Sequence, residues 1–263
     1  MRFTQVDAFT PNRFAGNPAA VIPLDAWLDD AMLIAIAAEN NLPETAFLVP
    51  TDRIDADHEL RWFSPTCEIA MCGHATLAAG HVLLGDAPGR DRIRFATRRA
   101  GILTVDRDPA GYALDLPATR MTATTNPALL AALGLSGGAV LHSTPPVQET
   151  TIIMLPDEAA VRALAPDMAA LAALRLMAIC TAPGDRTDIV SRVFVPAWGI
   201  DEDPVTGAAH AALAPFWSER LGRSEITAHQ ASARGGDLLC RVRGDRVILV
   251  GQCVTVIEGC FHL

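Results

Sequence analysis

Alternating and helical hydrophobic patterns divide the chain into many short strands and a few helices. Alternation of apolar and polar residues predicts strands at 2–9, 19–24, 45–49, 93–97, 101–105 and 112–116. Asp29 or Asp30 can cap a helix that runs to about Asn40 and places Met32, Leu33, Ile36 and Ala37 on one face. The pattern therefore predicts a strand-rich α+β segment in the first half of the chain.

One predicted helix, Gly73 to Leu84, differs from the others because it is apolar nearly all the way round. It follows an extended run from Glu59 to Ala70, and a helix without a polar face is usually buried on all sides. Its first turn leaves backbone N–H groups without partners and carries a partial positive charge. We expect a ligand carboxylate or phosphate at this end.

The second half repeats parts of the first. A polar stretch without a period, 117–126, is interpreted as a linker between domains 1–118 and 119–263, and the last strand can cross back. Beyond it, the pattern predicts helices at 127–133 and between 157 and 174, with strands near 140, 151–155, 177, 190–195, 238–242, 246–250 and 254–257.

An internal duplication is suggested by two matching stretches. The run 61–65 (RWFSP) resembles 192–196 (RVFVP), and Glu68 and Glu202 each stand five residues before a glycine that opens an Ala-rich helix. Pro215 lies inside the second of these helices, which is therefore expected to be kinked or short. Two such halves would face each other across a cleft, with the helix starts at Gly73 and Gly207 forming one anion site.

Composition excludes several classes of function. Half of the 263 residues are hydrophobic, 19% are charged, and the net charge of -9 without a Lys/Arg run argues against a nucleic-acid partner. No apolar run is long enough for a membrane span, and the N-terminus does not resemble a signal peptide. The six cysteines lack metal-ligand spacing, so we expect reduced thiols, no metal and a cytoplasmic location.

Four residues could carry chemistry. Glu44 follows a proline and precedes a strand, so it could act as general acid or base, or be an ordinary surface glutamate. His74 could contact substrate as a neutral imidazole, because the helix end disfavours its charged form, or could be a capping or core residue. Asp203 could serve the site or only favour the helix dipole. Cys72 could be a nucleophile, although a buried hydrophobe is the commoner fate of a lone cysteine.

The chain contains no dinucleotide glycine fingerprint, P-loop, Gly-x-Ser-x-Gly elbow or His-Glu-x-x-His pair. We therefore expect chemistry by side chains alone, without a cofactor. His210, which follows Gly207 on the second helix, is interpreted as a core residue.

Six motifs in order resemble one family over nearly the whole chain. They are residues 7–9 (DAF), 14–21 (FAGNPAAV), 41–47 (NLPETAF), 60–65 (LRWFSP), 72–76 (CGHAT) and 202–207 (EDPVTG). Together they are similar to the phenazine-biosynthesis isomerase family (PhzF-like). The resemblance implies the α+β fold of the diaminopimelate epimerase superfamily, with two similar domains, each a curved, mostly antiparallel sheet around a central helix.

The same resemblance implies cofactor-independent proton transfer in the cleft between the domains, and a homodimer. Glu44 matches the family's acid/base glutamate, with His74 and Asp203 at positions that line the site. Gly73, Gly207, Ala208 and Asn17 are the expected substrate-binding positions. Where the family motif usually continues Gly-Ser-Ala-His, this chain has 207–210 as GAAH. A hydroxyl is therefore missing at Ala208, next to the expected substrate carboxylate.

These residues suggest an isomerase acting on a small carboxylate, with Glu44 moving the proton. Two alternatives stay open. One is a two-base racemase or epimerase, for which Cys72 would need a second thiol where Thr206 stands. The other is a member of the fold that binds a small molecule without turnover, which the loss at Ala208 allows.

Overall fold

The computed structural model describes residues 1–143 and 149–263 and divides the chain into two compact units. The first unit comprises 1–115 and 250–263, and the second comprises 116–249. The sequence-based boundary was placed after residue 118. Each unit is an α+β body, and no helix in the described parts of the chain is both long and apolar enough to cross a membrane.

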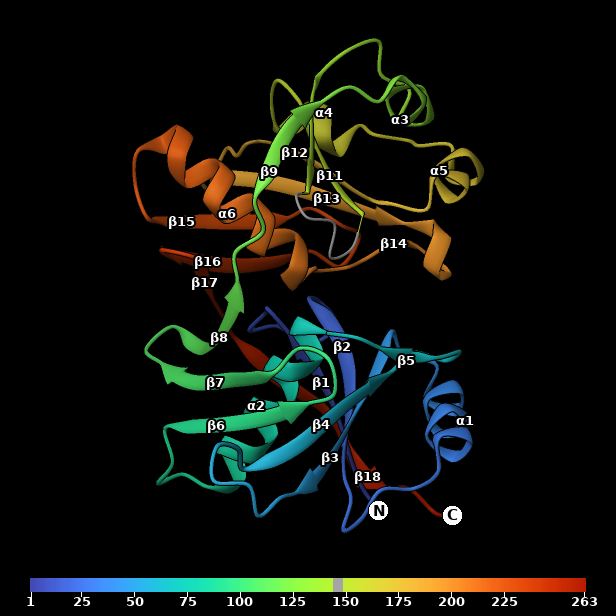
Figure 1. Ribbon diagram of the computed structural model, residues 1–263, viewed down its shortest axis with the longest axis vertical. Helices are drawn as coiled ribbons and strands as arrows, with labels where there is room; N and C mark the ends of the chain where they lie inside the picture. The colour runs from blue at the N-terminus through green and yellow to red at the C-terminus, as the bar shows by residue number, and fades with distance from the viewer. Residues whose placement is uncertain (144–148) are drawn as a thin grey trace. The chain divides into compact units, whose positions relative to one another are not determined.

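The first unit wraps a curved sheet around helix α2 (Figure 1). Its strands are β1 (Arg2–Ala8), β2 (Asn17–Pro23), β3 (Glu44–Pro50), β4 (His58–Phe63), β5 (Glu68–Ile69), β6 (Arg92–Thr97), β7 (Ile102–Asp108), β8 (Gly111–Pro117) and β18 (Cys253–Cys260). Its helices are α1 (Asp30–Asn40) and α2 (Gly73–Asp86). Strand β18 pairs with β1, and the chain continues β1–β2–β3–β4–β6–β7–β8, antiparallel except for the parallel pairs β2–β3 and β4–β6.

Helix α2 is buried because it has no polar face. It packs against β1, β2, β3, β6, β7 and β18, and even its first-turn residues are buried. Gly80 lets the helix approach β7, since a Cβ there would lie 2.4 Å from Val105 Cγ1. A second core lies between the sheet and α1, which Asp29 caps by accepting from the Met32 N–H. Leu33, Ile36 and Ala37 are buried as expected, but Met32 is 39% exposed, so its predicted place on the apolar face is wrong.

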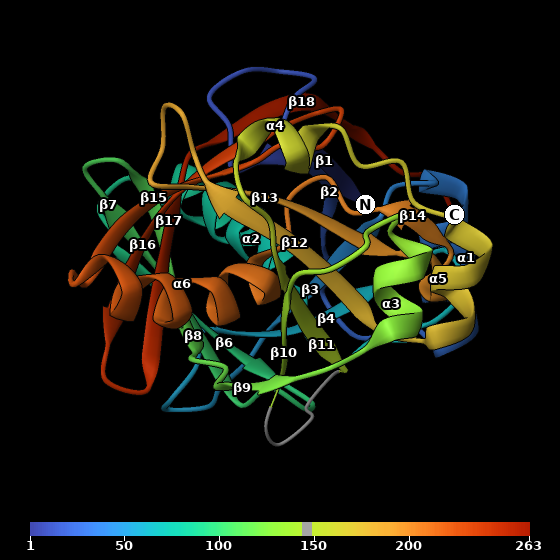
Figure 2. The same ribbon diagram turned by 90° about the horizontal axis from the view of Figure 1, so that it is seen from above.

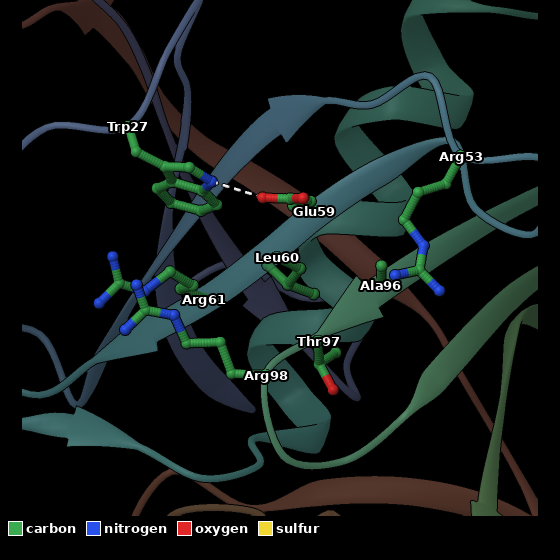
Figure 3. Close-up of a pocket in the computed structure, with 8 residues that line it drawn as sticks. All are labelled: Trp27, Arg53, Glu59, Leu60, Arg61, Ala96, Thr97 and Arg98. Atoms are coloured by element: carbon green, nitrogen blue, oxygen red, sulfur yellow. Dashed lines mark hydrogen bonds between the residues drawn. The ribbon is translucent and has the colours of Figure 1, made fainter.

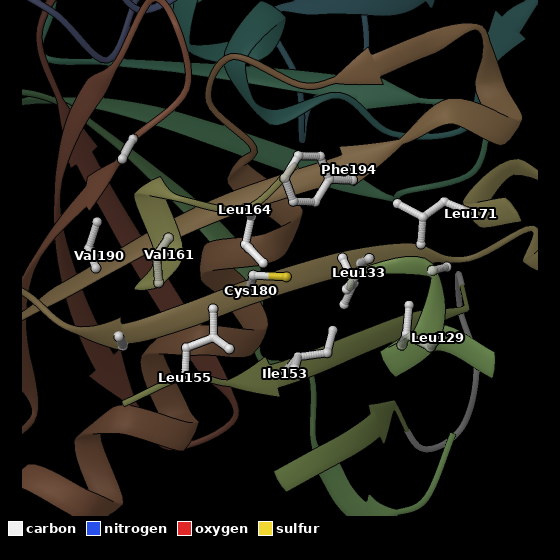
Figure 4. Close-up of a cluster of buried hydrophobic side chains, with 14 of the residues drawn as sticks. Leu129, Leu133, Ile153, Leu155, Val161, Leu164, Leu171, Cys180, Val190 and Phe194 are labelled. Carbon is white, nitrogen blue, oxygen red and sulfur yellow. The ribbon is translucent and has the colours of Figure 1, made fainter. Parts of the chain in front are cut away.

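The second unit repeats this plan. Its strands are β9 (Met121–Thr124), β10 (Ala139–Ser143), β11 (Thr150–Met154), β12 (Met177–Pro183), β13 (Ile189–Val195), β14 (Ile200–Glu202), β15 (Glu225–Gln230), β16 (Gly236–Arg243) and β17 (Arg246–Gly251). Its helices are α3 (Pro127–Ala132), α4 (Glu158–Arg162), α5 (Met168–Leu174) and α6 (Gly207–Leu221), with a 3-10 turn η1 (Pro196–Trp198). Figure 2 shows α4 beside β12 and β13, and the apolar cluster around Phe194 and Cys180 fills the space beneath α4 and α5 (Figure 4).

The order of pairings is the same in both units. In the second unit β10–β11, β12–β13 and β15–β16 are antiparallel, while β11–β12 and β13–β15 are parallel. The registers agree residue for residue: Phe63 pairs with Thr45 in one unit, and Phe194 pairs with Ala178 in the other. The fold predicted from the family resemblance, two similar α+β domains around central helices, is confirmed.

Two local predictions need correction. The stretch 117–126 is not only a linker, because β9 lies within it and pairs with β10. Of the two outcomes expected from Pro215, a kinked or a short helix, the short one is wrong, since α6 runs fifteen residues to Leu221 with the proline inside. Proline there removes one backbone hydrogen bond, but burial of the next two side chains, Phe216 and Trp217, holds the helix in place.

Candidate functional site

Three polar side chains meet at one edge of the first unit's sheet. Asn17 and Glu44 begin the neighbouring parallel strands β2 and β3, where Ala19 pairs with Glu44. Because the amino ends of parallel strands lie at the same edge, these side chains emerge side by side. His74, in the first turn of α2, reaches the same place from inside the sheet.

The distances define a compact cluster around the His74 ring. Its Nε2 atom lies 3.2 Å from Glu44 Oε2, and its Nδ1 atom lies 3.1 Å from Asn17 Nδ2. The His74 and Glu44 side chains are only 5% and 15% exposed. Although close, His74 Nε2 and Glu44 Oε2 are not aligned as a hydrogen bond, and neither has another partner within the described residues. These two buried polar atoms are therefore available to bind a third group.

The charge of His74 differs from the sequence-based expectation. Burial lowers the pKa of His74, but Cys72 and Glu44 outweigh it and raise this pKa well above the ordinary value. Burial and the Glu44 carboxylate also raise the pKa of the Cys72 thiol, so that thiol is neutral near pH 7. We therefore assign the effect on His74 to Glu44. The expectation of a neutral imidazole is wrong, because a full carboxylate charge 3.2 Å away is stronger than a partial helix charge.

Cys72 itself is a poor nucleophile in this setting. Its Sγ atom lies 3.5 Å from His74 Nδ1 and the residue is 7% exposed. Since the thiolate is the reactive form, a raised pKa makes the group inert at neutral pH. The buried-hydrophobe interpretation of Cys72 fits this arrangement best.

The starts of the two core helices share an unusual feature. Helices α1, α3, α4 and α5 each have an Asp or Asn whose side chain accepts a hydrogen bond from the first turn. The N-cap residues of α2 and α6, Cys72 and Thr206, make no such bond. At α2, the start at Gly73 and the buried His74 Nε2 together offer donors and positive charge to an anion.

The remaining predicted site residues belong to the second unit. Asp203 accepts a 2.6 Å hydrogen bond from the Thr206 hydroxyl, just before α6 begins at Gly207. Gln230 joins this network by accepting from the Thr206 N–H and donating to the Asp203 carbonyl. Gln230 was not anticipated, because no hydrophobic pattern marked β15 as a strand. His210 is fully buried and donates from Nδ1 to the Thr206 carbonyl, as expected of a core residue.

The matching registers show which positions of the two units correspond. Glu44 corresponds to Met177, and the helix positions Cys72 and His74 correspond to Thr206 and Ala208. The first unit therefore places a carboxylate and an imidazole beside its helix start, whereas the second unit has Met177 and Ala208 at the corresponding positions.

The same cluster is the place where a metal ion could be held. One ligand atom each from Glu44, Cys72 and His74 lie within 4.8 Å of one another. However, Cys72 approaches Nδ1 of the His74 ring and Glu44 approaches Nε2. One ion could not bind all three without reorientation of the ring.

Comparison with known proteins agrees with this architecture. The model of the PhzC-PhzF family, described as phenazine biosynthesis-like protein, matches residues 6–259. A Pseudomonas aeruginosa protein named as an uncharacterized isomerase is 47% identical over 98% of both chains. The crystal structure of a PhzF-family protein from Enterococcus faecalis superposes with a TM-score of 0.90 at 40% identity, covering 100% of this chain and 99% of that one.

A more distant match shows the fold alone. A hydroxyproline epimerase from Agrobacterium vitis superposes with a TM-score of 0.62 at 11% identity, over 98% of this chain and 91% of that one. The overall fold is thus shared with that protein. The family model and the close relatives, which span almost the full length on both sides, lead to one conclusion: this chain belongs to the PhzC-PhzF family of phenazine biosynthesis-like proteins.

Proposed function

We propose that the protein is a cofactor-independent isomerase that moves a proton on a small carboxylate substrate, with Glu44 as the acid/base group. The isomerase names of close relatives support the class of reaction. One observation carries the assignment to Glu44: its carboxylate lies 3.2 Å from a buried histidine at the uncapped start of a buried helix.

In this proposal the α2 start at Gly73 binds the substrate carboxylate through backbone N–H groups. Glu44 removes a proton from a carbon near that carboxylate, the proton on the Glu44 carboxyl exchanges with solvent, and Glu44 then delivers a proton to another carbon, so that no oxidant or reductant is consumed. His74, held in its charged form by Glu44, stabilises negative charge as it develops on the substrate. Asn17 orients the charged His74 ring through its side-chain oxygen, with the amide turned by 180°, because Nδ1 of a charged imidazole is a donor.

The alternatives are less well supported. A two-base racemase needs a second acid/base group, but Thr206 and Ala208 stand at the positions that correspond to Cys72 and His74. The buried, neutral Cys72 thiol also lacks the reactivity that a thiol base requires. The roles of Asp203, Gly207 and Ala208, the cytoplasmic location and the homodimer stay predictions from sequence and family.

The test is a metabolite screen in D2O, in which mass spectrometry detects carbon-bound deuterium. We expect incorporation with the native protein, and Glu44→Gln should reduce its rate by at least about a hundredfold because the base is lost. Glu39→Gln, on the exposed surface of α1, is the matched control and should exchange normally. Undiminished exchange in Glu44→Gln would show that another group is the base. Binding of a metabolite without exchange would favour the non-catalytic alternative.

A further inference from the structure

A pocket of about 280 Å³ opens on the outer face of β4 and β6 in the first unit, and none of its lining residues belongs to the Glu44 cluster. Figure 3 shows Trp27 and Glu59 on one wall, joined by a hydrogen bond from Trp27 Nε1 to Glu59 Oε2 of 2.6 Å. Arg61 and Arg98 lie beside them, and Arg53 lines another part of the wall. Three guanidinium groups and the Glu59 carboxylate thus line the pocket, and each arginine also pairs with a further acidic residue: Arg53 with Asp55, and Arg61 and Arg98 with Glu68.

The second unit contains an arginine equivalent to Arg61, Arg192, whose contacts show what an arginine at this position binds. Arg61 holds Glu68 through Nε and Nη2 at 2.7 and 3.0 Å, and Arg192 holds Glu202 in the same way at 2.8 and 2.9 Å. Each guanidinium also lies over a phenylalanine two residues along its strand, at 4.8 and 4.9 Å. The two arginines are structural equivalents.

Their remaining nitrogen atoms differ. Arg192 Nη1 donates to the carbonyl oxygens of Val161, Arg162 and Leu164, at 3.5, 3.3 and 2.8 Å, where α4 ends. Arg61 Nη1 makes no hydrogen bond within the described residues. In both arginines the ion pair with glutamate thus leaves Nη1 available as a donor. In the second unit Nη1 donates to backbone carbonyl oxygens.

The registers show that α4 covers the positions that line the pocket. Glu59 and Ala96 face each other in β4 and β6, and the corresponding pair in β13 and β15 is Val190 and His229. In the second unit Val190 is buried in one cluster with Val161 of α4. The pocket in the first unit is therefore the space that α4 fills in the second.

Chain length explains the difference. The strand residues Leu24 and Leu155 are equivalent, each donating its N–H to the next strand. The helix cap Asp29 follows Leu24 by five positions, whereas the cap Asp167 follows Leu155 by twelve. The first unit is seven residues shorter here, too short to include a helix like α4, and the Trp27 ring lies over Arg61 in its place.

We propose that this pocket binds a small molecule that carries both a carboxylate and an ammonium group, with an α-amino acid as the representative ligand. Arg61 Nη1 donates to the carboxylate as Arg192 Nη1 donates to carbonyls, and the 55% exposed Arg98 adds positive charge. Glu59 Oε1 has no partner in the described parts of the chain and accepts from the ammonium group. A simple anion would be repelled by Glu59, so the opposite charges favour a zwitterion.

The test uses ¹⁹F NMR of protein labelled with 5-fluorotryptophan, in which Trp27→Phe assigns the Trp27 resonance. We expect L-leucine to shift this resonance saturably, while acetate or ethylammonium alone at the same concentration does not. Trp62, Trp198 and Trp217 lie outside the pocket and should keep their shifts. No change of the Trp27 resonance with L-leucine, or an equal change with acetate alone, overturns the proposal.

Three variants locate the ligand. Glu59→Gln and Arg98→Gln should each weaken L-leucine binding about tenfold, because Glu59→Gln removes the negative charge that faces the ammonium group and Arg98→Gln removes a positive charge near the carboxylate. Arg92→Gln is the matched control, since Arg92 forms an exposed ion pair with Asp106 away from the pocket, and its affinity should be unchanged. Unchanged affinity in both pocket variants contradicts the assignment. These readouts do not depend on isomerase activity, so this proposal and the proposed function can fail separately.

Discussion

His74 and His210 lie in the first turns of the two core helices, and their surroundings give them opposite charge states. His74 lies beside a carboxylate, which raises its pKa despite burial. Burial of His210 outweighs its bond to the Thr206 carbonyl and lowers its pKa to about 4. One helix start thus carries a charged imidazole and the other a neutral one, so the two repeats can do different chemistry.

Acid should destabilise the protein through His210. Its pKa in the folded state, about 4, lies below the unfolded value near 6.5, so the unfolded chain takes up the proton first as pH falls. The stabilising contribution is complete above pH 6.5 and is lost as pH falls to 4, by about 3 kcal/mol in total. Urea unfolding across this range, compared with His210→Gln, measures it, and NMR of the imidazole should show no titration of His210 until about pH 4.

The contribution of His74 to stability changes with pH in the opposite direction. Because its folded-state pKa is raised, its contribution is complete below about pH 6.5 and declines as pH rises through the folded-state value. In the same NMR titration the His74 ring should remain protonated above pH 7. A His74 resonance that titrates below 6.5 would contradict the role assigned to Glu44.

At the residue scale, sequence reasoning succeeds where the signal is a repeat and fails where it is a long-range contact. The match of Arg61 and Glu68 to Arg192 and Glu202 is visible in the sequence, and the structure shows the same ion pair twice. The charge of His74 could not be predicted, because Glu44 lies thirty positions away in the sequence. Only the packing of α2 against β3 brings the two side chains together.

At the scale of single elements, α2 offers a matched pair of glycines. Gly80→Ala would place a Cβ 2.4 Å from Val105 Cγ1 and 2.7 Å from its Cβ, so β7 must move. We expect a loss of about 1–3 kcal/mol in the free energy of unfolding. Gly85→Ala, on the same helix with no atom within 4 Å of the new Cβ, should be neutral or stabilising by up to about 1 kcal/mol.

Urea unfolding of Gly80→Ala and Gly85→Ala measures this difference in stability. Equal stability of Gly80→Ala and Gly85→Ala would show that α2 is not packed tightly against β7. Both changes add the same methyl group to one helix. The difference between their free energies of unfolding therefore separates the effect of packing from that of helix propensity.

The elements that the sequence missed share a physical cause. The core helices and central strands are buried on one or more sides, so burial imposes a hydrophobic period. Strand β9 is largely exposed and pairs with β10 through its backbone, which leaves no such period in its side chains. Strand β15 buries small or polar residues, Ala228 and Gln230, so its alternation is invisible on a hydrophobicity scale.

At the scale of the whole molecule, the first unit is built from both ends of the chain. Strand β18 pairs with β1 along its length, and the Met1 amino group donates to the Phe261 carbonyl at 2.7 Å. The Phe261 N–H returns a bond to the Met1 carbonyl, also 2.7 Å. The two ends are thus close enough to be joined by a short linker.

A rearranged chain tests this organisation. Residues 250–263, a short Gly/Ser linker and residues 1–115 in one polypeptide should fold cooperatively as the first unit, measured by urea unfolding and the fluorescence of Trp27 and Trp62. Residues 1–115 alone lack β18 and leave the edge of β1 open, so they should show no cooperative transition and should aggregate. Identical unfolding curves for the two polypeptides would mean that β18 contributes nothing to the unit.

The pairing of β1 with β18 also sets the order of events during protein synthesis. The ribosome makes β1 before the whole second unit and its partner β18 after it, whereas the second unit is one continuous stretch that can close as soon as it leaves the exit tunnel. Every nascent chain therefore carries an unpaired edge at β1 until β18 has been synthesised. Chaperones that shield exposed edges matter most for this protein in that interval, and a stalled ribosome leaves the half that contains Glu44 unfinished.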